Sequence, residues 1–574
     1  MNESDRRTAL GVALAAAVAL VLRFALLDAR MFHWDEARVG YLTLQFAATG
    51  HYEYRPIVHG PFLFLVNRVV FDVFGATDYA ARAVVALVGG LFPLTAWLYR
   101  DHLDRAETVC FAALLALNPV LLYYSRFMRN DVLVAAFAVA TVGLCLRARA
   151  TGRHGYLYAA AVAFALAFST KENALLYLFC WLGALAVLLD HYILRARATG
   201  GDALQPYVDL LGGLWDAVNR RETPAAERAR RRLRVPPAVA ERWPPAVVAL
   251  LVFVVAWIFL FAPRPDVYQP SAYPHLLDDA TVGAVRSFLD QWGSGHESSY
   301  SSFFVDQGKV LAEAAFVTTL LAVLGFFADR YRERGPRPLV TFAAAWALAS
   351  LLGYPAITDI SGHWSVVHVV VPLALLGGVG GGLLVRRSAR AVRAGDTVGV
   401  ALAVVVLVAA VGQVGVVAAQ TSYTNHSDPD NVLVQYGQPA YDVRPALDDT
   451  ARIAADHEGT DLLFYGSHFN VANEPSIRDT DLPAGNWYNR LPLPWYLARS
   501  NVTVDSTTNL AAVNDTAPPV VLAKAEHYQE LSETLPGYDA RTYRLTSTNT
   551  VIVVFVDPAA LPEPQARDGT DVHT

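Results

Sequence analysis

The sequence carries little charge and very little cysteine or lysine. Of its 574 residues, 17% are charged and three are cysteines. Because all three cysteines lie inside apolar runs, we predict no disulfide framework; they are Cys110, Cys145 and Cys180. No Cys or His spacing indicates a zinc site, and we expect no metal or other cofactor. The net charge of −6 argues against nucleic acid as a partner.

Lysine occurs only at Lys171, Lys309 and Lys524, so almost every basic residue is an arginine. The segment after Ala419 is acidic, with 21 Asp or Glu against 9 Arg or Lys. An acidic, lysine-poor surface indicates a high-salt, halophilic environment. A high genomic GC content would also favour arginine over lysine, so both explanations stay open.

Long apolar runs are plentiful, since 54% of the residues are hydrophobic. Runs of about 18 residues or more are typical of helices that span a membrane. The first run, Ala9 to Leu27, has no small-residue cleavage site after it, so we predict a retained helix rather than a signal peptide. We predict eleven spans, at about 9–28, 79–99, 106–124, 132–147, 156–168, 174–194, 245–263, 310–328, 338–354, 365–385 and 397–418.

Arginine positions predict which ends of these spans face the cytoplasm. With a cytoplasmic N-terminus, the inner segments hold 25 arginines, including the cluster from Arg195 to Arg242, and the outer loops before residue 310 hold 8. This asymmetry agrees with the positive-inside rule for a multi-pass plasma-membrane protein. The apolar stretch Pro61 to Gly75 would invert every later loop if it crossed, so we predict an interfacial helix there, and a second at Ala37 to Thr49.

Two domains are expected, a helical membrane domain over residues 1–418 and an extracytoplasmic α/β domain over residues 419–574. In the second, Arg444–Glu458 has helical periodicity. Asp461–Gly466, Pro519–Lys524 and Thr550–Asp557 are predicted strands, the last two rich in valine. Alternating elements of this kind are typical of a small α/β domain.

The stretch Met31 to Gly40, M-F-H-W-D-E-A-R-V-G, places two adjacent acids where the chain leaves the first span. Chemistry on a lipid-borne substrate needs its catalytic group at this depth, which makes Asp35 and Glu36 candidate catalytic residues. Alternatively, they are solvated acids that mark the membrane exit. Neighbouring residues near a helix start point about 100° apart, so they cannot both face one cavity.

Other ionisable residues gather at the same predicted side. The loop S-R-F-M-R-N-D supplies Arg126, Arg129 and Asp131, and the turn S-T-K-E-N supplies Lys171 and Glu172. Charges at membrane depth are costly and more often functional than decorative. Arg126, Arg129 and Lys171 together would suit a phosphate. Alternatively, Lys171 and Glu172 form a local ion pair and the arginines contact headgroups. The further candidates for supporting roles are Asp131, Glu172, His59, His363 and Trp364.

The H-W-D-E-A stretch, the S-R-F-M-R-N-D loop and the T-K-E-N turn resemble GT-C glycosyltransferases over about residues 9–200. The resemblance is to the protein O-mannosyltransferase and aminoarabinose-transferase group, and more narrowly to an archaeal branch associated with flippase activity. It implies transfer of a sugar from a polyprenyl-phosphate (dolichyl-phosphate) donor on the outer face, with inversion. The acceptor does not follow from the resemblance, and we expect a protein or a glycan. The resemblance also implies that the catalytic acid is the Asp of the pair, Asp35.

Two other classes remain open. The chain could be a flippase-associated component that handles a lipid-linked sugar without transfer, although transporters usually carry ionisable residues near the bilayer midplane. It could also be a catalytically silent scaffold that recruits partners through its acidic tail.

Overall fold

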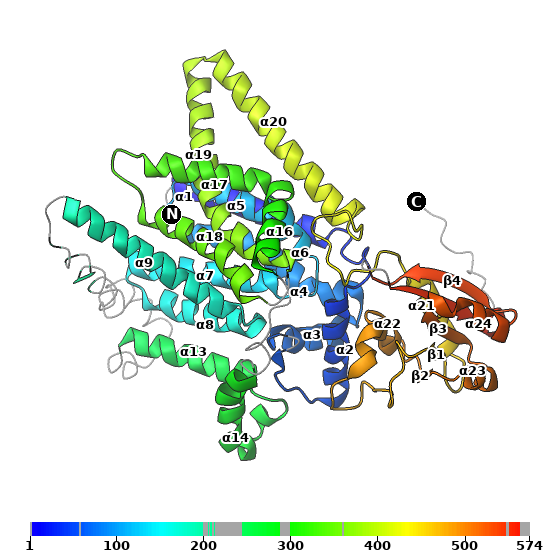
Figure 1. Ribbon diagram of the computed structural model, residues 1–574. Helices are drawn as coiled ribbons and strands as arrows, with labels where there is room; N and C mark the ends of the chain where they lie inside the picture. The colour runs from blue at the N-terminus through cyan, green and yellow to red at the C-terminus, as the bar shows by residue number, and fades with distance from the viewer. Residues whose placement is uncertain are drawn as a thin grey trace.

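The computed structural model describes residues 3–56, 59–198, 202, 205, 207–208, 212, 244–287, 299–358, 361–546 and 550–562. Figure 1 shows a bundle of long helices with a small α/β domain at one end. Most of the predicted basic cluster from Arg195 to Arg242 lies outside the described residues.

The helices before residue 420 follow the predicted apolar runs. They are α1 (Glu3–Phe24), α2 (Trp34–Thr49), α3 (Phe62–Phe74), α4 (Asp78–Leu91) continued by η2 (Phe92–Tyr99), α5 (Arg105–Leu117), α6 (Pro119–Tyr124), α7 (Asp131–Thr151), α8 (His154–Thr170), α9 (Ala174–Ala198), α13 (Pro245–Phe261), α14 (Tyr273–Asp278), α16 (Tyr300–Glu313), α17 (Phe316–Arg330), α18 (Pro338–Ile357), α19 (Val366–Ala394) and α20 (Thr397–Ala419). Shorter turns of 3₁₀ or π helix are η3 (Asp266–Tyr268), η4 (Pro270–Ala272), η5 (Asp279–Gly283), η6 (His363–Ser365) and η7 (Gln420–Thr424).

Within the described residues, seven helical stretches are long and apolar enough to cross a membrane. The pair α16 and α17 bends by 93° at its break and makes an eighth if it is one span. The seven are Asp5–Phe24, Asp78–Tyr99, Asp131–Thr151, Ala174–Ala198, Pro338–Ile357, His363–Ala394 and Thr397–Thr424.

The predicted count of eleven spans is therefore corrected to seven or eight by length and composition. Helices form at all eleven predicted places, but α8 and α13 have only 17 residues each. At 1.5 Å per residue such helices are about 25 Å long, shorter than a hydrocarbon core of about 30 Å. Helix α5 ends at Leu117 because Asn118 caps a new short helix, α6, that begins at Pro119.

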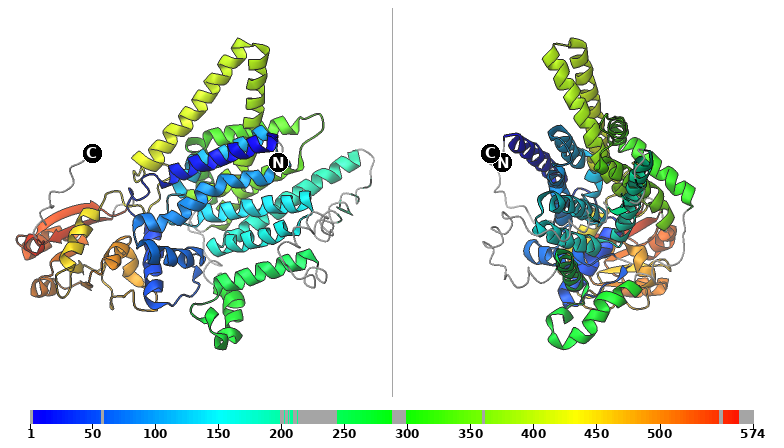
Figure 2. Two further views of the ribbon diagram at one scale, coloured as in Figure 1. Left: turned by 180° about the vertical axis from the view of Figure 1, so that it is seen from behind. Right: turned by 90° about the vertical axis from the view of Figure 1, so that its left-hand side faces the viewer.

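The N-terminus and the α/β domain lie at opposite ends of the bundle, as Figures 1 and 2 show. Helices α2 and α3 lie at the end that carries the α/β domain. Neither is among the stretches long enough to span, in agreement with two interfacial helices, although α2 begins at Trp34 rather than Ala37.

The C-terminal part is a small α/β domain, as predicted. Its five strands have the order β2-β1-β3-β5-β4, with β1 parallel to β2 and β3, and β5 antiparallel to β3 and β4. The strands are β1 (Leu462–Tyr465), β2 (Val504–Thr507), β3 (Val520–Lys524), β4 (Asp539–Arg544) and β5 (Val551–Val556). The helices are α21 (Arg444–Ala454), α22 (Leu493–Arg499), α23 (Leu510–Thr516) and α24 (Tyr528–Thr534), with short turns η8 (Gly485–Arg490), η9 (Ala525–His527) and η10 (Pro558–Ala560).

The α/β domain packs directly on the start of the membrane part. Buried Asp78, in the first turn of α4, accepts hydrogen bonds of 2.9 Å from Trp495, Tyr496 and Arg499. Gly40 of α2 lies so close to Trp495 that an added Cβ would come within 2.7 Å of the indole. Buried residues of α2, α3 and the sheet form one continuous hydrophobic core. This packing holds the M-F-H-W-D-E stretch against a rigid support.

Candidate active site

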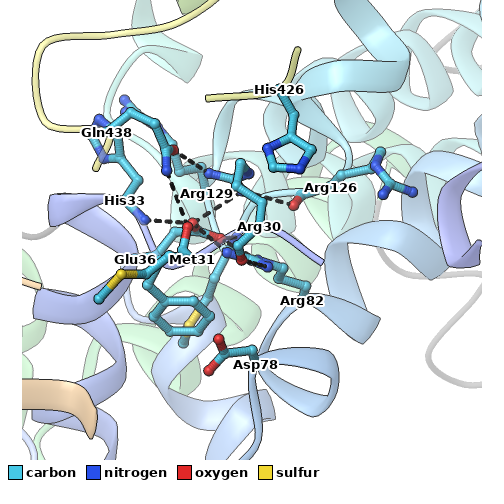
Figure 3. Close-up of polar contacts among 12 residues, drawn as sticks. Arg30, Met31, His33, Glu36, Asp78, Arg82, Arg126, Arg129, His426 and Gln438 are labelled. Carbon is cyan, nitrogen blue, oxygen red and sulfur yellow. Dashed lines mark hydrogen bonds and ion pairs between the residues drawn. The ribbon is translucent and has the colours of Figure 1, made fainter. Parts of the chain in front are cut away.

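Glu36 is the centre of a buried network at the start of α2. His33 caps the helix, and the Glu36 carboxylate accepts from the His33 backbone N–H at 2.9 Å, which completes a capping box. Arg82 of α4 donates to both carboxylate oxygens, at 2.8 and 2.9 Å, and Arg30 lies 3.1 Å away. The backbone N–H of Met128 also donates to Glu36 at 2.8 Å. Figure 3 shows this convergence on Glu36.

This network fixes Glu36 as an ionised residue. Its side chain is fully buried. Burial alone would raise the pKa of Glu36, but the charges of Arg30 and Arg82 outweigh it and lower that pKa to about 2. Arg38 and Arg55 do not take part in this network, because Arg38 pairs with Asp35 and Arg55 with Glu53. Glu36 thus joins α2, the segment between α1 and α2, α4 and the loop before α7.

Asp35, the next residue back, points elsewhere. Its side chain is 28% exposed, and it forms ion pairs with Arg129 at 2.8 Å and Arg38 at 3.2 Å. Burial would raise the pKa of Asp35, but the charges of Arg129 and Arg38 hold it well below its ordinary value. Asp35 is therefore an accessible carboxylate that is already engaged by cations.

A second buried cluster lies behind Arg129. Asp131, at the start of α7, accepts from Lys171 Nζ at 2.8 Å and lies 3.4 Å from Arg129 Nε. The Lys171 ammonium lies 3.6 Å from the centre of the Trp364 ring, a cation–π contact. His368 Nε2 of α19 lies 3.8 Å from Asp131. Segments that are far apart in sequence thus contact the same acid, Asp131.

Lys171 and Glu172 do not pair with each other, which overturns the local ion-pair alternative. Glu172 instead accepts from the Tyr54 hydroxyl at 2.7 Å and lies 3.2 Å from His59 Nδ1. Burial and the charge of Lys171 lower the pKa of His59, whereas Glu172 opposes this shift. These contacts attach the loop between α2 and α3 to the turn between α8 and α9.

The predicted phosphate-binding trio is brought together only in part. Arg129 and Lys171 share Asp131, but Arg126 points to the C-terminal end of α1. There it donates to backbone carbonyls, including Arg23 at 3.1 Å and Leu26 at 2.7 Å. The positive charge of Arg126 therefore stabilises the C-terminal end of α1, where the helix dipole is negative. His363 lies beside Trp364 in η6, and no hydrogen bond or ion pair joins it to Asp35, Arg129 or Lys171 among the described residues.

Sequence reasoning missed the linker after α20. Gln435 accepts from Arg129 Nη1 at 2.6 Å, and Gln438 accepts from Arg30 at 2.5 Å. Between them, the Gly437 carbonyl accepts from the Trp34 N–H at 3.0 Å. Two glutamines of a connecting segment therefore complete the two charge networks, one each. The repeated Gln in Q-Y-G-Q was a weak signal without knowledge of the fold.

No group of three or more His, Cys, Asp and Glu side chains is placed to hold a metal ion in the part of the chain that the structure describes. Asp131 is surrounded by Lys171, Arg129 and His368. The arrangement favours an anionic ligand: cations stand beside an accessible carboxylate at the end of a membrane bundle.

The membrane part has a GT-C-like fold. The chain is similar to ArnT from Cupriavidus metallidurans in the apo state, with a TM-score of 0.53 and 17% identity over 96% of this chain and 99% of ArnT. The structure of ArnT bound to undecaprenyl phosphate gives 0.52 and 19% identity, with the same coverage. The Archaeoglobus fulgidus oligosaccharyltransferase complexed with Zn and sulfate gives 0.47 and 14%, over 96% of this chain and 74% of that one.

Family models match two segments. Residues 58–199 match dolichyl-phosphate-mannose-protein mannosyltransferase, and residues 443–557 match the Agl23 flippase-associated protein C-terminal domain. A comparison with curated proteins finds no match. The chain thus carries a membrane segment that matches the dolichyl-phosphate-mannose-protein mannosyltransferase model and a C-terminal segment that matches the Agl23 flippase-associated C-terminal domain. The predicted family resemblance is confirmed at this level.

Proposed function

We propose that the protein transfers a sugar from a polyprenyl-phosphate donor to a protein or glycan acceptor on the extracytoplasmic face. The observation that carries this proposal is the separation of the two adjacent acids. Asp35 is partly exposed beside Arg129, whereas Glu36 is buried and fully engaged. An accessible base next to a guanidinium is the arrangement that transfer from a phosphate leaving group needs. The ArnT structure bound to undecaprenyl phosphate supports a lipid phosphate as ligand.

In the proposed reaction, an acceptor hydroxyl oxygen bonds to the anomeric carbon of the sugar as the bond from that carbon to the phosphate oxygen breaks. The hydroxyl proton passes to Asp35, and the polyprenyl phosphate leaves against Arg129 and Lys171. Attack opposite to the leaving group inverts the anomeric centre. Trp364 holds the Lys171 ammonium by its ring face.

The low pKa of Asp35 makes it a weak base while Arg129 is bound to it. A donor phosphate would compete for the Arg129 guanidinium, which forms strong paired hydrogen bonds with phosphate. As Arg129 turns to the phosphate, Asp35 loses a stabilising charge and its pKa rises. Donor binding would thus activate the base.

The test is transfer by Asp35→Asn in the full-length protein with a labelled polyprenyl-phosphate sugar. We expect a loss of about 10²–10⁴-fold in rate, the usual effect of removing a positioned base. Asp72→Asn, on an exposed position of α3, is the matched control and should keep full rate. Full activity in Asp35→Asn would reject the mechanism.

The proposal also needs the site to face outward. We propose a cytoplasmic N-terminus in the plasma membrane, supported by the arginine asymmetry. Reporter fusions after Arg105 and Arg390 should read as cytoplasmic, and fusions after Gly362 and Asp430 as external. The acidic, lysine-poor tail supports a high-salt environment, and the resemblance to the flippase-associated branch supports an archaeal source.

One observation favours a second function, namely the match of the C-terminal domain to a flippase-associated protein. The chain would then bind a lipid-linked sugar to aid its translocation. Labelled donor in sealed vesicles distinguishes the two: transfer consumes the donor, whereas translocation moves it intact between leaflets.

A further inference from the structure

A small recess lies beside the Glu36 network, between the C-terminal end of α1, the end of α6 and η7. Its polar lining comes from Arg30, Tyr123, Arg126, Ser422 and His426. Figure 3 shows Arg126 and His426 next to Arg30, on the side away from His33. The recess has a volume of about 220 Å³ when the solvent-filled space at its opening is included. Its enclosed inner part admits only a water-sized group.

The lining is built from buried polar groups. Arg30, Arg126 and Ser422 are 5%, 6% and 3% exposed. The Ser422 hydroxyl has no hydrogen-bond partner within the described part of the chain. A buried hydroxyl without a partner is costly, and it lines a recess between two arginines. This group points to a ligand.

The charge around the recess is one-sided, and no carboxylate lines it. Arg30 shares Glu36 with Arg82, and Arg126 has only backbone carbonyls as hydrogen-bond partners among the described residues. Burial, and then the charges of Arg30 and Arg126, lower the pKa of His426 to about 4. His426 therefore stays neutral in a positive field. An anion in the recess would balance this field.

We propose that this recess is a second anion site, which binds a phosphate monoester and is separate from the site at Arg129 and Lys171. The phosphate sits at the mouth between Arg30 and Arg126. One oxygen is directed inward, where it accepts from the Ser422 hydroxyl. The ligand is a lipid headgroup or a soluble phosphate, since both present the same tetrahedral oxygens. This proposal concerns binding only and does not depend on sugar transfer.

The experiment measures the thermal stability of the full-length protein in nonionic detergent during titration with inorganic phosphate. We expect phosphate to raise the melting temperature. Ser422→Ala should weaken the apparent affinity about tenfold, the usual effect of losing a hydrogen bond to a charged group. Ser422→Val, which fills the inner part, should remove the stabilisation by phosphate that remains in a Lys171→Met background. Ser388→Ala, which deletes a hydroxyl in α19 that does not line the recess, is the matched control.

A Lys171→Met variant separates the two sites, because phosphate should still stabilise it. A second titration with short-chain phosphatidic acid separates the two sources. Tighter binding of this lipid identifies a headgroup, and equal binding identifies a soluble phosphate. The proposal fails if phosphate has no effect on the native protein. It also fails if Ser422→Ala and Ser422→Val bind like the native protein, or if Lys171→Met alone abolishes binding.

Discussion

Asp35 and Glu36 are adjacent in sequence but belong to two different regions of the molecule. Glu36 lies in the buried network with Arg30 and Arg82, where its side chain is fully buried. Asp35 lies at the edge of the Arg129 and Lys171 region, where part of its carboxylate meets solvent. Because neighbouring side chains on a helix point about 100° apart, Glu36 is buried and stabilises the fold, whereas Asp35 lies where a substrate can reach it.

The largest effect expected on stability comes from the buried region. Glu36→Gln removes the charge that Arg30 and Arg82 share, and breaking a buried pair costs about 3–5 kcal/mol. We expect a strongly lowered melting temperature and poor membrane yield, whereas Asp35→Asn should fold nearly as well as the native protein. The assignment of Glu36 to stability and Asp35 to catalysis is wrong if Glu36→Gln folds normally and Asp35→Asn does not.

A smaller effect is expected from Lys171. Lys171→Met should weaken donor use about 10- to 100-fold, which is the value of a charge-assisted contact to phosphate. It also leaves Asp131 as a buried charge with one partner fewer, so some stability is lost as well.

The double variant Lys171→Met with Asp131→Asn separates these two losses, because it removes both charges of the pair. Stability should return while donor use stays impaired. Recovery of both would show that Lys171 only serves to balance Asp131.

Candidate site residues that stand out in a local sequence pattern could be predicted from the sequence. The D-E pair after the first apolar run and the K-E turn between two helices are visible without a fold. Their partners could not be predicted, because Glu36 pairs with Arg82, 46 residues later, and Lys171 with Asp131, 40 residues earlier. Such pairs depend on how helices pack.

Packing also decides which strands could be predicted from the sequence. Strands β1, β3 and β5 are buried and apolar, and they were predicted. The edge strands β2 and β4 carry mixed residues with partial exposure, such as Asp505 and Arg541, and were missed. The span count failed for a geometric reason, since apolarity alone does not show that α8 and α13 stop at 17 residues.

Acid pH should loosen the Glu36 region. Because the folded-state pKa of Glu36 is lowered to about 2, its contribution to stability is present above its ordinary pKa of about 4.3 and is lost as pH falls toward 2. Arg30→Gln should raise that pKa and shift acid unfolding to higher pH. Arg55→Gln, whose partner Glu53 is exposed, is the control. The midpoint is measured in phosphate-free buffer, and an unshifted midpoint in Arg30→Gln would contradict the assignment.

The smallest effects should come from the two glutamines of the linker, which contact one region each. Gln435 accepts from Arg129, and buried Gln438 accepts from Arg30 and donates to the Met31 carbonyl at 3.1 Å. One such hydrogen bond is worth about 0.5–1.5 kcal/mol, or up to about 3 kcal/mol with a charged group. Gln435→Ala should therefore raise the KM for donor about 3- to 10-fold through a less well positioned Arg129, with an unchanged melting temperature. Gln438→Ala should lower the melting temperature by a few degrees and leave KM unchanged. If both variants change the same quantity, the two regions act as one unit, and the division between Asp35 and Glu36 is wrong.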